Sequence, residues 1–355
     1  MWAMILKEFL ELRRDKRTMA MIVVLPLLLL VVFGYAANFR VDDVSTRVYG
    51  PQAQAVAAQL KAPFDVEEVD PSGTREQAVD DLRTQDAGAV VVTGESGGAS
   101  TVLIDGSNQF AAQAAASASL ASGGVLKPDI LFNPELKTSW VMVPALIGMI
   151  MAFIGTIVTA IGLVRERQAG TLEQLAVMPF KASDVIVGKI APYFVLAAVD
   201  MVLVTVLGCL LFGVPFSGNV LVLALGAVLF LFTVLGIGVL ISSVSQNQGQ
   251  AMQMALLTLM PQILLSGMIF PLAAMAAGVR WIGYLFPLTY FNMISNGVML
   301  RDAPLSSLAL PLGVLAGMSV LVFTAAVLRF RRDLAPAAPK KKTAAPAAAA
   351  AGSTR

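Results

Sequence analysis

The chain has 355 residues, of which 57% are hydrophobic and 14% charged, with a mean hydropathy of +0.77 and a formal net charge of +2. Soluble domains carry about 25% charged residues, so this composition indicates a membrane protein. There is no histidine and a single cysteine, Cys209, which excludes Ser-His-Asp and Cys-His catalysis, the usual zinc sites and an intrachain disulfide.

Residues 1–18 are predicted to form an amphipathic helix along the cytoplasmic face of the membrane, or a simple cationic anchor. The apolar run 19–37 follows five lysines and arginines and is long enough to cross a hydrocarbon core of about 30 Å. It is too long for the core of a typical signal peptide and has no convincing cleavage site. We therefore predict a retained first transmembrane helix.

Residues 38–138 differ in character from the rest of the chain. They hold 14 Asp and Glu against 7 Lys and Arg, and short β-branched runs alternate with helical stretches. This pattern predicts an α/β domain inserted after the first span.

Five further apolar runs predict five more transmembrane helices within residues 139–330. They cover residues 140–164, 185–212, 220–242, 251–270 and 308–330. The fold class is therefore an α-helical polytopic membrane protein with six transmembrane helices and an inserted extracytoplasmic α/β domain. Residues 271–302 are broken by prolines and glycines, so we expect re-entrant or interfacial helices at the outer surface. Residues 331–355 are rich in Ala, Pro and Lys and are expected to be a disordered cytoplasmic tail.

The charges predict the orientation of the chain. With the N-terminus in the cytoplasm, the inner segments hold 16 Lys and Arg against 7 Asp and Glu, in agreement with the positive-inside rule. The acidic 38–138 domain then lies outside, and both termini are cytoplasmic.

The segment between the second and third spans carries the most informative motif. It begins with Arg165, Glu166 and Arg167 at the membrane edge. Thr171 and Gln174 form a T-x-x-Q capping box that starts a short helix, which Pro179 ends. Such a helix either transmits force from a partner or merely connects two spans.

The stretch RERQAGTLEQLAVMPFKASDVIVGKIAPYF resembles the hallmark loop of type-2 ABC transporter permeases. The matched positions are Arg165, Glu166, Arg167, residues 170–175, Pro179, Gly188, Lys189, Pro192 and Tyr193. A second similar segment matches at Ser266, Gly267, Phe270, Pro271 and residues 287–291. Asn296 stands where the family commonly has Arg. The DGSN at 105–108 also fits the larger exporters of this family.

The resemblance implies one half of an exporter. Two six-span permeases, identical or paralogous, would pair, and two cytoplasmic ABC ATPase subunits would bind ATP and Mg below them. This chain has no G-x-x-x-x-G-K-[ST] motif and is expected to bind no cofactor or metal itself. The implied ATPase-coupling residues are Arg165, Glu166, Gly170, Thr171, Glu173, Gln174, Leu175, Met178 and Pro179, with the coupling helix at 171–179. The implied outer gate comprises Phe270, Pro271, Pro287, Tyr290 and Phe291.

Asp200 is the one acidic residue deep within an apolar run. It is a candidate for contact with a cationic substrate or for proton relay, since ionisable groups in a membrane are costly. The alternative is a structural hydrogen bond to a neighbouring helix.

We expect a permease that moves a hydrophobic or amphiphilic substrate, such as a drug or lipid, out across a bacterial inner membrane. Its partners would be the ATPase, a second permease, membrane lipids and a periplasmic protein at the outer domain, and not nucleic acid. The alternative is a membrane sensor or scaffold whose outer domain binds a ligand. An intramembrane enzyme is disfavoured because the spans offer little beyond Asp200 for catalysis.

Overall fold

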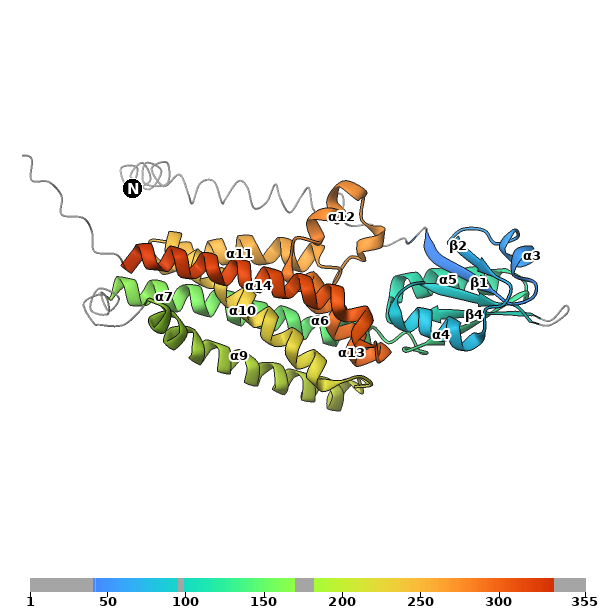
Figure 1. Ribbon diagram of the computed structural model, residues 1–355, viewed down its shortest axis with the longest axis horizontal. Helices are drawn as coiled ribbons and strands as arrows, with labels where there is room; N and C mark the ends of the chain where they lie inside the picture. Colours follow the sequence, from blue (N-terminus) through green and yellow to red (C-terminus); the bar gives the residue numbers. More distant parts are fainter. Residues whose placement is uncertain (1–40, 42, 95–98, 170–181, 335–355) are drawn as a thin grey trace, which may run out of the picture.

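The computed structural model describes residues 41, 43–94, 99–169 and 182–334. The predicted helix 1–18, the first span at 19–37, the coupling helix at 171–179 and nearly all of the predicted tail lie outside these residues. The molecule is elongated, with an α/β domain at one end of a helical bundle (Figure 1).

The α/β domain is a mixed five-stranded sheet in the order β2-β1-β3-β4-β5. Strands β3 and β4 are antiparallel, and the other neighbouring pairs are parallel. Its elements are β1 (Val44–Tyr49), α3 (Ala53–Ala57), β2 (Phe64–Asp70), α4 (Arg75–Thr84), β3 (Ala89–Val92), β4 (Ser100–Asp105), α5 (Gln109–Ala121) and β5 (Leu126–Leu131).

Helices cover both faces of this sheet because its central strands are apolar on both sides. Val90 and Leu103 face a cluster formed with Leu82 of α4, whereas Val91 and Val102 face a second cluster with the alanines of α5. The predicted α/β character of this region is confirmed.

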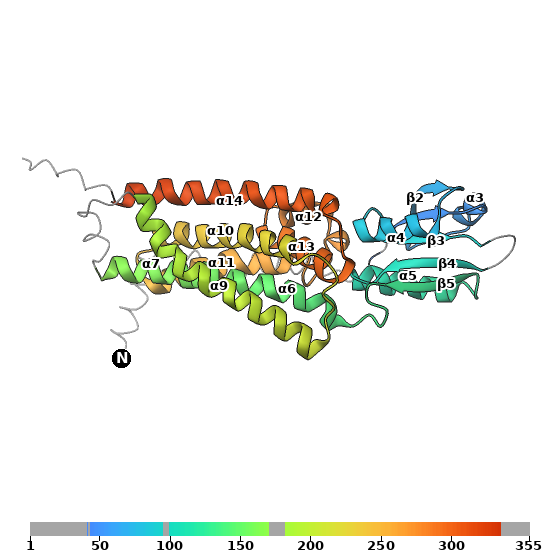
Figure 2. The ribbon, with the colours of Figure 1, turned by 60° about the horizontal axis from the view of Figure 1, so that its bottom comes forward.

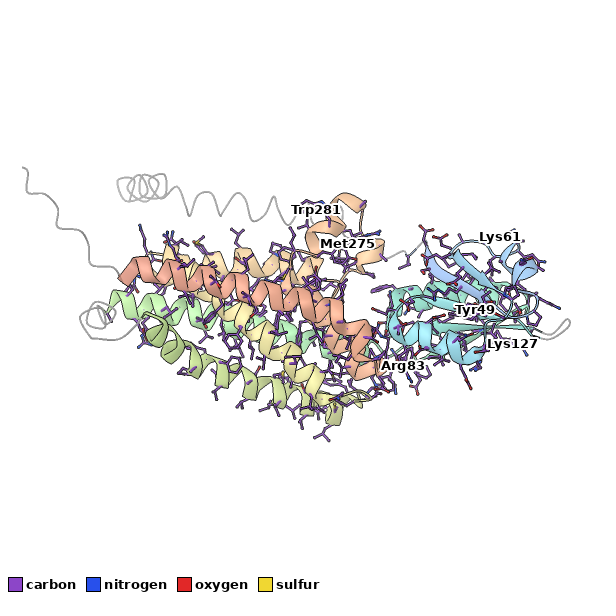
Figure 3. All side chains as sticks on the ribbon, in the orientation of Figure 1. Tyr49, Lys61, Arg83, Lys127, Met275 and Trp281 are labelled. Carbon is purple, nitrogen blue, oxygen red and sulfur yellow. The ribbon has the colours of Figure 1, made fainter. Side chains whose placement is uncertain are left out.

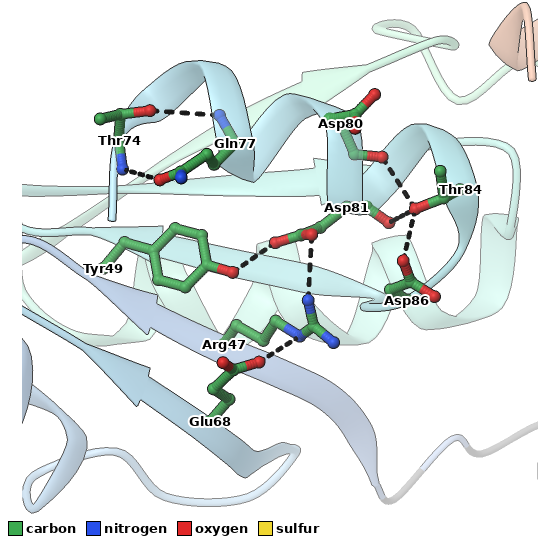
Figure 4. Close-up of polar contacts among 9 residues, drawn as sticks. All are labelled: Arg47, Tyr49, Glu68, Thr74, Gln77, Asp80, Asp81, Thr84 and Asp86. Carbon is green, nitrogen blue, oxygen red and sulfur yellow. Dashed lines mark hydrogen bonds and ion pairs between the residues drawn. The ribbon is translucent and has the colours of Figure 1, made fainter. Parts of the chain in front are cut away.

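A polar network fixes α4 on the sheet (Figure 4). Arg47 of β1 forms ion pairs with Glu68, at 3.2 Å, and Asp81, at 2.9 Å. The hydroxyl of Tyr49 donates to the other Asp81 oxygen. Burial and this hydrogen bond raise the pKa of Tyr49 to about 12. At its other end α4 begins with a capping box at Thr74.

The bundle follows directly from β5. The elements α6 (Thr138–Phe153), η1 (Ile154–Val158) and α7 (Thr159–Gln168) form one continuous helix, in which η1 is a π-turn. The later elements are α9 (Ala182–Phe212), α10 (Val220–Val244), α11 (Gln248–Leu265), η2 (Leu272–Ala274), α12 (Ala277–Gly283), α13 (Pro287–Arg301) and α14 (Leu305–Leu334).

Four helical stretches of the described residues are long and apolar enough to cross a membrane. They are Thr138–Gln168, Ala191–Phe212, Val220–Val244 and Leu305–Arg329, in agreement with four of the predicted spans. The predicted span at 251–270 is not among them: α11 ends at Leu265, and its four glutamines lower its hydropathy. Helix α14 extends to Leu334, so the predicted tail begins as helix. The count of six spans stays a prediction.

Helix α10 lies at the centre of the bundle and contacts α6, α7, α9, α13 and α14. Figure 2 shows α14 along one side of it and α6 along the other. Gly238 of α10 allows close approach to η1, because a β-carbon there would lie 2.9 Å from the Thr156 carbonyl oxygen and 3.0 Å from that of Gly155. This packing holds the middle of the second predicted span.

Residues 271–302, the segment broken by prolines and glycines, have two parts with different environments. Elements η2 and α12 project from the bundle next to the α/β domain, where Trp281 is 58% exposed and Met275 is buried (Figure 3). Helix α13, in contrast, is buried along nearly its whole length and packs against α6, α10 and α14. Helix α13 thus has apolar side chains facing other helices on several sides, and the assignment of residues 271–302 as re-entrant or interfacial helices stays a prediction.

Candidate functional site at the two ends of the bundle

Arg167 joins two helices at the bundle end farther from the α/β domain. Its guanidinium donates to the carbonyl oxygens of Ser242, at 3.0 Å, and Ser245, at 3.3 Å. These carbonyls belong to the C-terminus of α10, which has no further helical donors and carries partial negative charge. Gln248, at the start of α11, donates to Gln168 at 3.3 Å. The ends of α7, α10 and α11 are thus tied together.

Of the predicted coupling residues, the described part of the chain contains only Arg165 and Glu166. Arg165 is exposed and Glu166 is half-buried at the end of α7. The remaining coupling candidates, from Gly170 to Pro179, lie outside the described residues. Sequence reasoning treated Arg167 as one motif position among many and did not find its carbonyl partners. The available signal was an arginine in the last turn of a helix, where such side chains bind carbonyl groups.

The predicted outer-gate residues fall into two clusters. Phe291 of α13 is fully buried in the main core and stacks on Phe230 of α10, with ring centroids 4.9 Å apart. Tyr290 is also buried there, and its hydroxyl donates to the Tyr284 carbonyl oxygen at 2.7 Å. Phe270 belongs to a smaller cluster beneath α12. Pro271 and Pro287 are both buried. Pro271 directly precedes η2, and Pro287 is the first residue of α13.

Asp200 lies on α9 and is half-buried. Its Oδ2 atom is inaccessible to solvent and has no hydrogen-bond partner among the described residues. The structural hydrogen bond considered as an alternative is therefore not made by this oxygen with the described part of the chain. A functional role for Asp200 remains a proposal.

At the opposite end of the bundle, a buried polar contact joins α13 to the α/β domain. The Arg301 guanidinium donates to the Ser107 hydroxyl at 3.1 Å and lies 3.7 Å from Oδ2 of Asp105. Arg301 and Asp105 are each 3% exposed. Burial raises the pKa of the Asp105 carboxyl, although Arg301 and the hydrogen bonds from Ser107 act in the opposite direction. Sequence reasoning noted the DGSN motif but did not pair it with Arg301.

Hydrogen bonds also join the α/β domain to the start of α6. The Asn133 side chain accepts from the Lys137 backbone nitrogen at 2.9 Å and donates to the Lys137 carbonyl at 3.1 Å. Gln109, in the first turn of α5, donates to the Thr138 hydroxyl at 2.8 Å. No group of three or more potential metal-ligating residues occurs in the described ranges.

These features define a multi-pass helical membrane protein with an α/β domain fixed to one end of its bundle. The chain matches the ABC-2 family transporter protein family over residues 16–328, and it belongs to this family. Such a chain is the membrane-spanning permease of an ABC transporter, a transport subunit and not the ATPase. The family implies an ATPase partner and a dimeric arrangement.

Relatives from Escherichia coli K12 are similar over most or part of their length. The probable multidrug ABC transporter permease YbhR is 26% identical, with 94% of this chain and 99% of the relative covered. The probable multidrug ABC transporter permease YbhS is 28% identical over 81% of this chain and 85% of the relative. The inner membrane transport permease YhhJ is 30% identical over 59% of this chain and 56% of the relative.

Proposed function

We propose that this permease moves a hydrophobic or amphiphilic substrate, such as a drug or lipid, outward across a bacterial inner membrane. Two permease chains, identical or paralogous, pair, and cytoplasmic ATPase subunits bind at the bundle end that carries Arg165. Both termini and this end of the bundle face the cytoplasm, and the α/β domain lies outside. ATP and Mg bind to the ATPase and not to this chain.

The observation that carries the proposal is the Arg167 contact. Residues 171–179 begin three positions after the last residue of α7, and Arg167 fixes this end of α7 to α10. A displacement of the coupling segment would therefore act on two spans at once. Hydrogen bonds and packed side chains between helices are the physical means by which such a displacement can reach the transport path.

The side chains within the bundle support the substrate class. Away from its ends, the described bundle offers Asp200 as its one acid, so a highly charged solute would find few partners. The buried side chains of Gln262 and Asn292 each retain a carbonyl oxygen without a hydrogen-bond partner among the described residues. Both oxygens are inaccessible to solvent, so they could accept from the polar group of a substrate only after the surrounding helices move apart. The names of YbhR and YbhS, both probable multidrug ABC transporter permeases, agree with this choice.

The test is ATP hydrolysis by the cognate ATPase, purified together with this protein in lipid. The variant Glu173→Ala/Leu175→Ala removes two predicted contacts of the coupling helix. We expect it to lose assembly with the ATPase or stimulation of ATP turnover by a lipophilic dye such as ethidium. The matched control is Glu67→Ala/Leu120→Ala, which changes the same residue types at exposed positions of the α/β domain.

Two outcomes decide between the functions. Loss of assembly or stimulation in the coupling variant alone supports the exporter. If no ATPase co-purifies and both variants behave like the wild type, the exporter proposal fails and a sensor with a ligand-binding outer domain replaces it.

A further inference from the structure

Among the described residues, the α/β domain contacts the bundle at three separate places. Gln109 and Asn133 bind Thr138 and Lys137 at the start of α6. Ala274 of η2 packs against the hydrophobic cluster of the domain that contains Val41. Arg301 enters the turn between β4 and α5. The domain is therefore a body held at several points, and not an appendage on a single linker.

The Arg301 contact differs from the other two because it is charged and buried. One oxygen of Asp105 accepts from the Ser107 backbone nitrogen at 2.9 Å, and the other faces the guanidinium. The Arg301 side chain folds back over its own helix, since a β-carbon on Gly297 would lie 3.2 Å from Nη2. Arginine and aspartate are rarely fully buried unless paired.

Such a contact favours two discrete arrangements. When docked, the two charges neutralise each other, and when separated, each must reach water. An intermediate position leaves a buried, unpaired charge, which is strongly unfavourable. The same cannot be said of the exposed pair Arg75–Asp129, whose members stay hydrated whether or not they meet at 2.6 Å.

Helix α13 is positioned to transmit the docking or undocking of Arg301 and Asp105 to the rest of the bundle. Arg301 is its last residue, and Tyr290 and Phe291 lie in its first half. Because α13 is packed against α6, α10 and α14, a shift of its end is transmitted to three helices.

We propose that Asp105, Ser107 and Arg301 form a positioning site through which the α/β domain holds α13, and with it the outer end of the transport path. This inference rests on the proposed export function. Arg301 and Asp105 act as positioning residues that set where α13 sits. Undocking them uncouples substrate passage from ATP hydrolysis, whereas hydrolysis itself continues.

The test measures the distance between two spin labels in the full chain, reconstituted in lipid and diluted with unlabelled protein. The labels occupy Asp80→Cys on α4 and Ser306→Cys on α14, two exposed positions, in a Cys209→Ser background. We expect one narrow distance population in the parent. Asp105→Asn and Arg301→Met should each broaden or split it, and Ser107→Ala should do so to a smaller degree.

Two controls separate positioning from a general loss of structure. Arg301→Lys keeps the charge and should retain a narrow population. Arg75→Met and Asp129→Asn remove the exposed pair of the same domain and should also leave it narrow. If Asp105→Asn and Arg301→Met fold and keep the parental distribution, the positioning site is refuted. Should either fail to fold, the milder Ser107→Ala decides, and an unchanged distribution in that variant refutes the site.

A second readout links the site to transport. Efflux of ethidium and ATP hydrolysis are measured on the same vesicles with the ATPase present. We expect efflux per ATP to fall about tenfold in Arg301→Met, within the range of known couplings between sites, with hydrolysis retained. Equal loss of both activities would contradict the uncoupling. If the parent itself shows neither activity, the export function fails, while the distance measurement still decides whether Asp105 and Arg301 position α13.

Discussion

Phe291 provides a quantitative test of how α13 is held in the bundle. Its ring is fully buried, stacks on Phe230 and contacts the helix surface at Gly148. In a membrane, truncation to alanine removes packing and not hydrophobic transfer, because lipid is as apolar as the protein core. A cavity of roughly 100 Å³ at about 24 cal/mol per Å³ lowers the free energy of unfolding by about 2.4 kcal/mol. Loss of the ring pair adds about 1 kcal/mol.

We therefore expect Phe291→Ala to lower the free energy of unfolding by about 3 kcal/mol. The assay is equilibrium unfolding in mixed micelles, followed by circular dichroism. A double-mutant cycle with Phe230→Ala should give a coupling of about 1 kcal/mol. The control Leu321→Ala lies on α14 at 69% exposure and should change little.

Additive effects of Phe230→Ala and Phe291→Ala would refute the reasoning, since the two rings would then not stabilise each other. A loss for Phe291→Ala no larger than that of Leu321→Ala would show that α13 is not packed as described. Either result would leave Phe291 free to act as a mobile gate residue.

The remaining predictions concern the α/β domain and the opposite end of the bundle. The pKa of Tyr49 is raised from 10.0 to about 12, so stability is unaffected below pH 10 and falls as pH rises toward 12, where the unfolded chain loses the phenol proton first. The midpoint of thermal unfolding of the full chain should fall between pH 10 and pH 12, and it should fall less in Tyr49→Phe. Identical pH dependence of the midpoint in the two proteins would contradict this prediction. Arg167→Ala should accelerate amide hydrogen exchange near Ser242 about tenfold, because two carbonyls lose a charged donor. The exposed neighbour Arg165 supplies the control, and equal effects of Arg165→Ala and Arg167→Ala would mean that the carbonyl contacts contribute nothing.

Elements defined by long apolar runs could be predicted from the sequence. Four spans agree with the structure because roughly 20 consecutive apolar residues leave no alternative to a membrane helix. The sequence was less informative about α11 and α13. In α11, four glutamines lower the mean hydropathy of the helix, and in α13 the prolines and glycines indicated a re-entrant or interfacial helix. Both helices owe their burial to neighbours that no local pattern reveals.

Some features of the candidate site could also be predicted from the sequence, and others could not. The motif from Arg165 to Tyr193 and the segment from Phe270 to Phe291 identified the family. Each is a short stretch of sequence whose characteristic residues can be recognised without knowledge of the fold. The separation of Phe270 from Phe291 into different clusters was not predictable, because it depends on how α12 and α13 turn after Pro271.

By itself, the sequence determined that this protein lies in a membrane, that it carries an α/β domain between apolar segments, and that it belongs with ABC permeases. Hydropathy and motif spacing are properties of residues close together in the sequence, so they can be determined without knowledge of the fold. Only the tertiary structure decided that Arg301 meets Ser107 across 194 positions of sequence and that Arg167 binds the end of α10. Such contacts join elements far apart in the chain, and their partners are chosen by the packing of the helices and by the need to satisfy a buried charge.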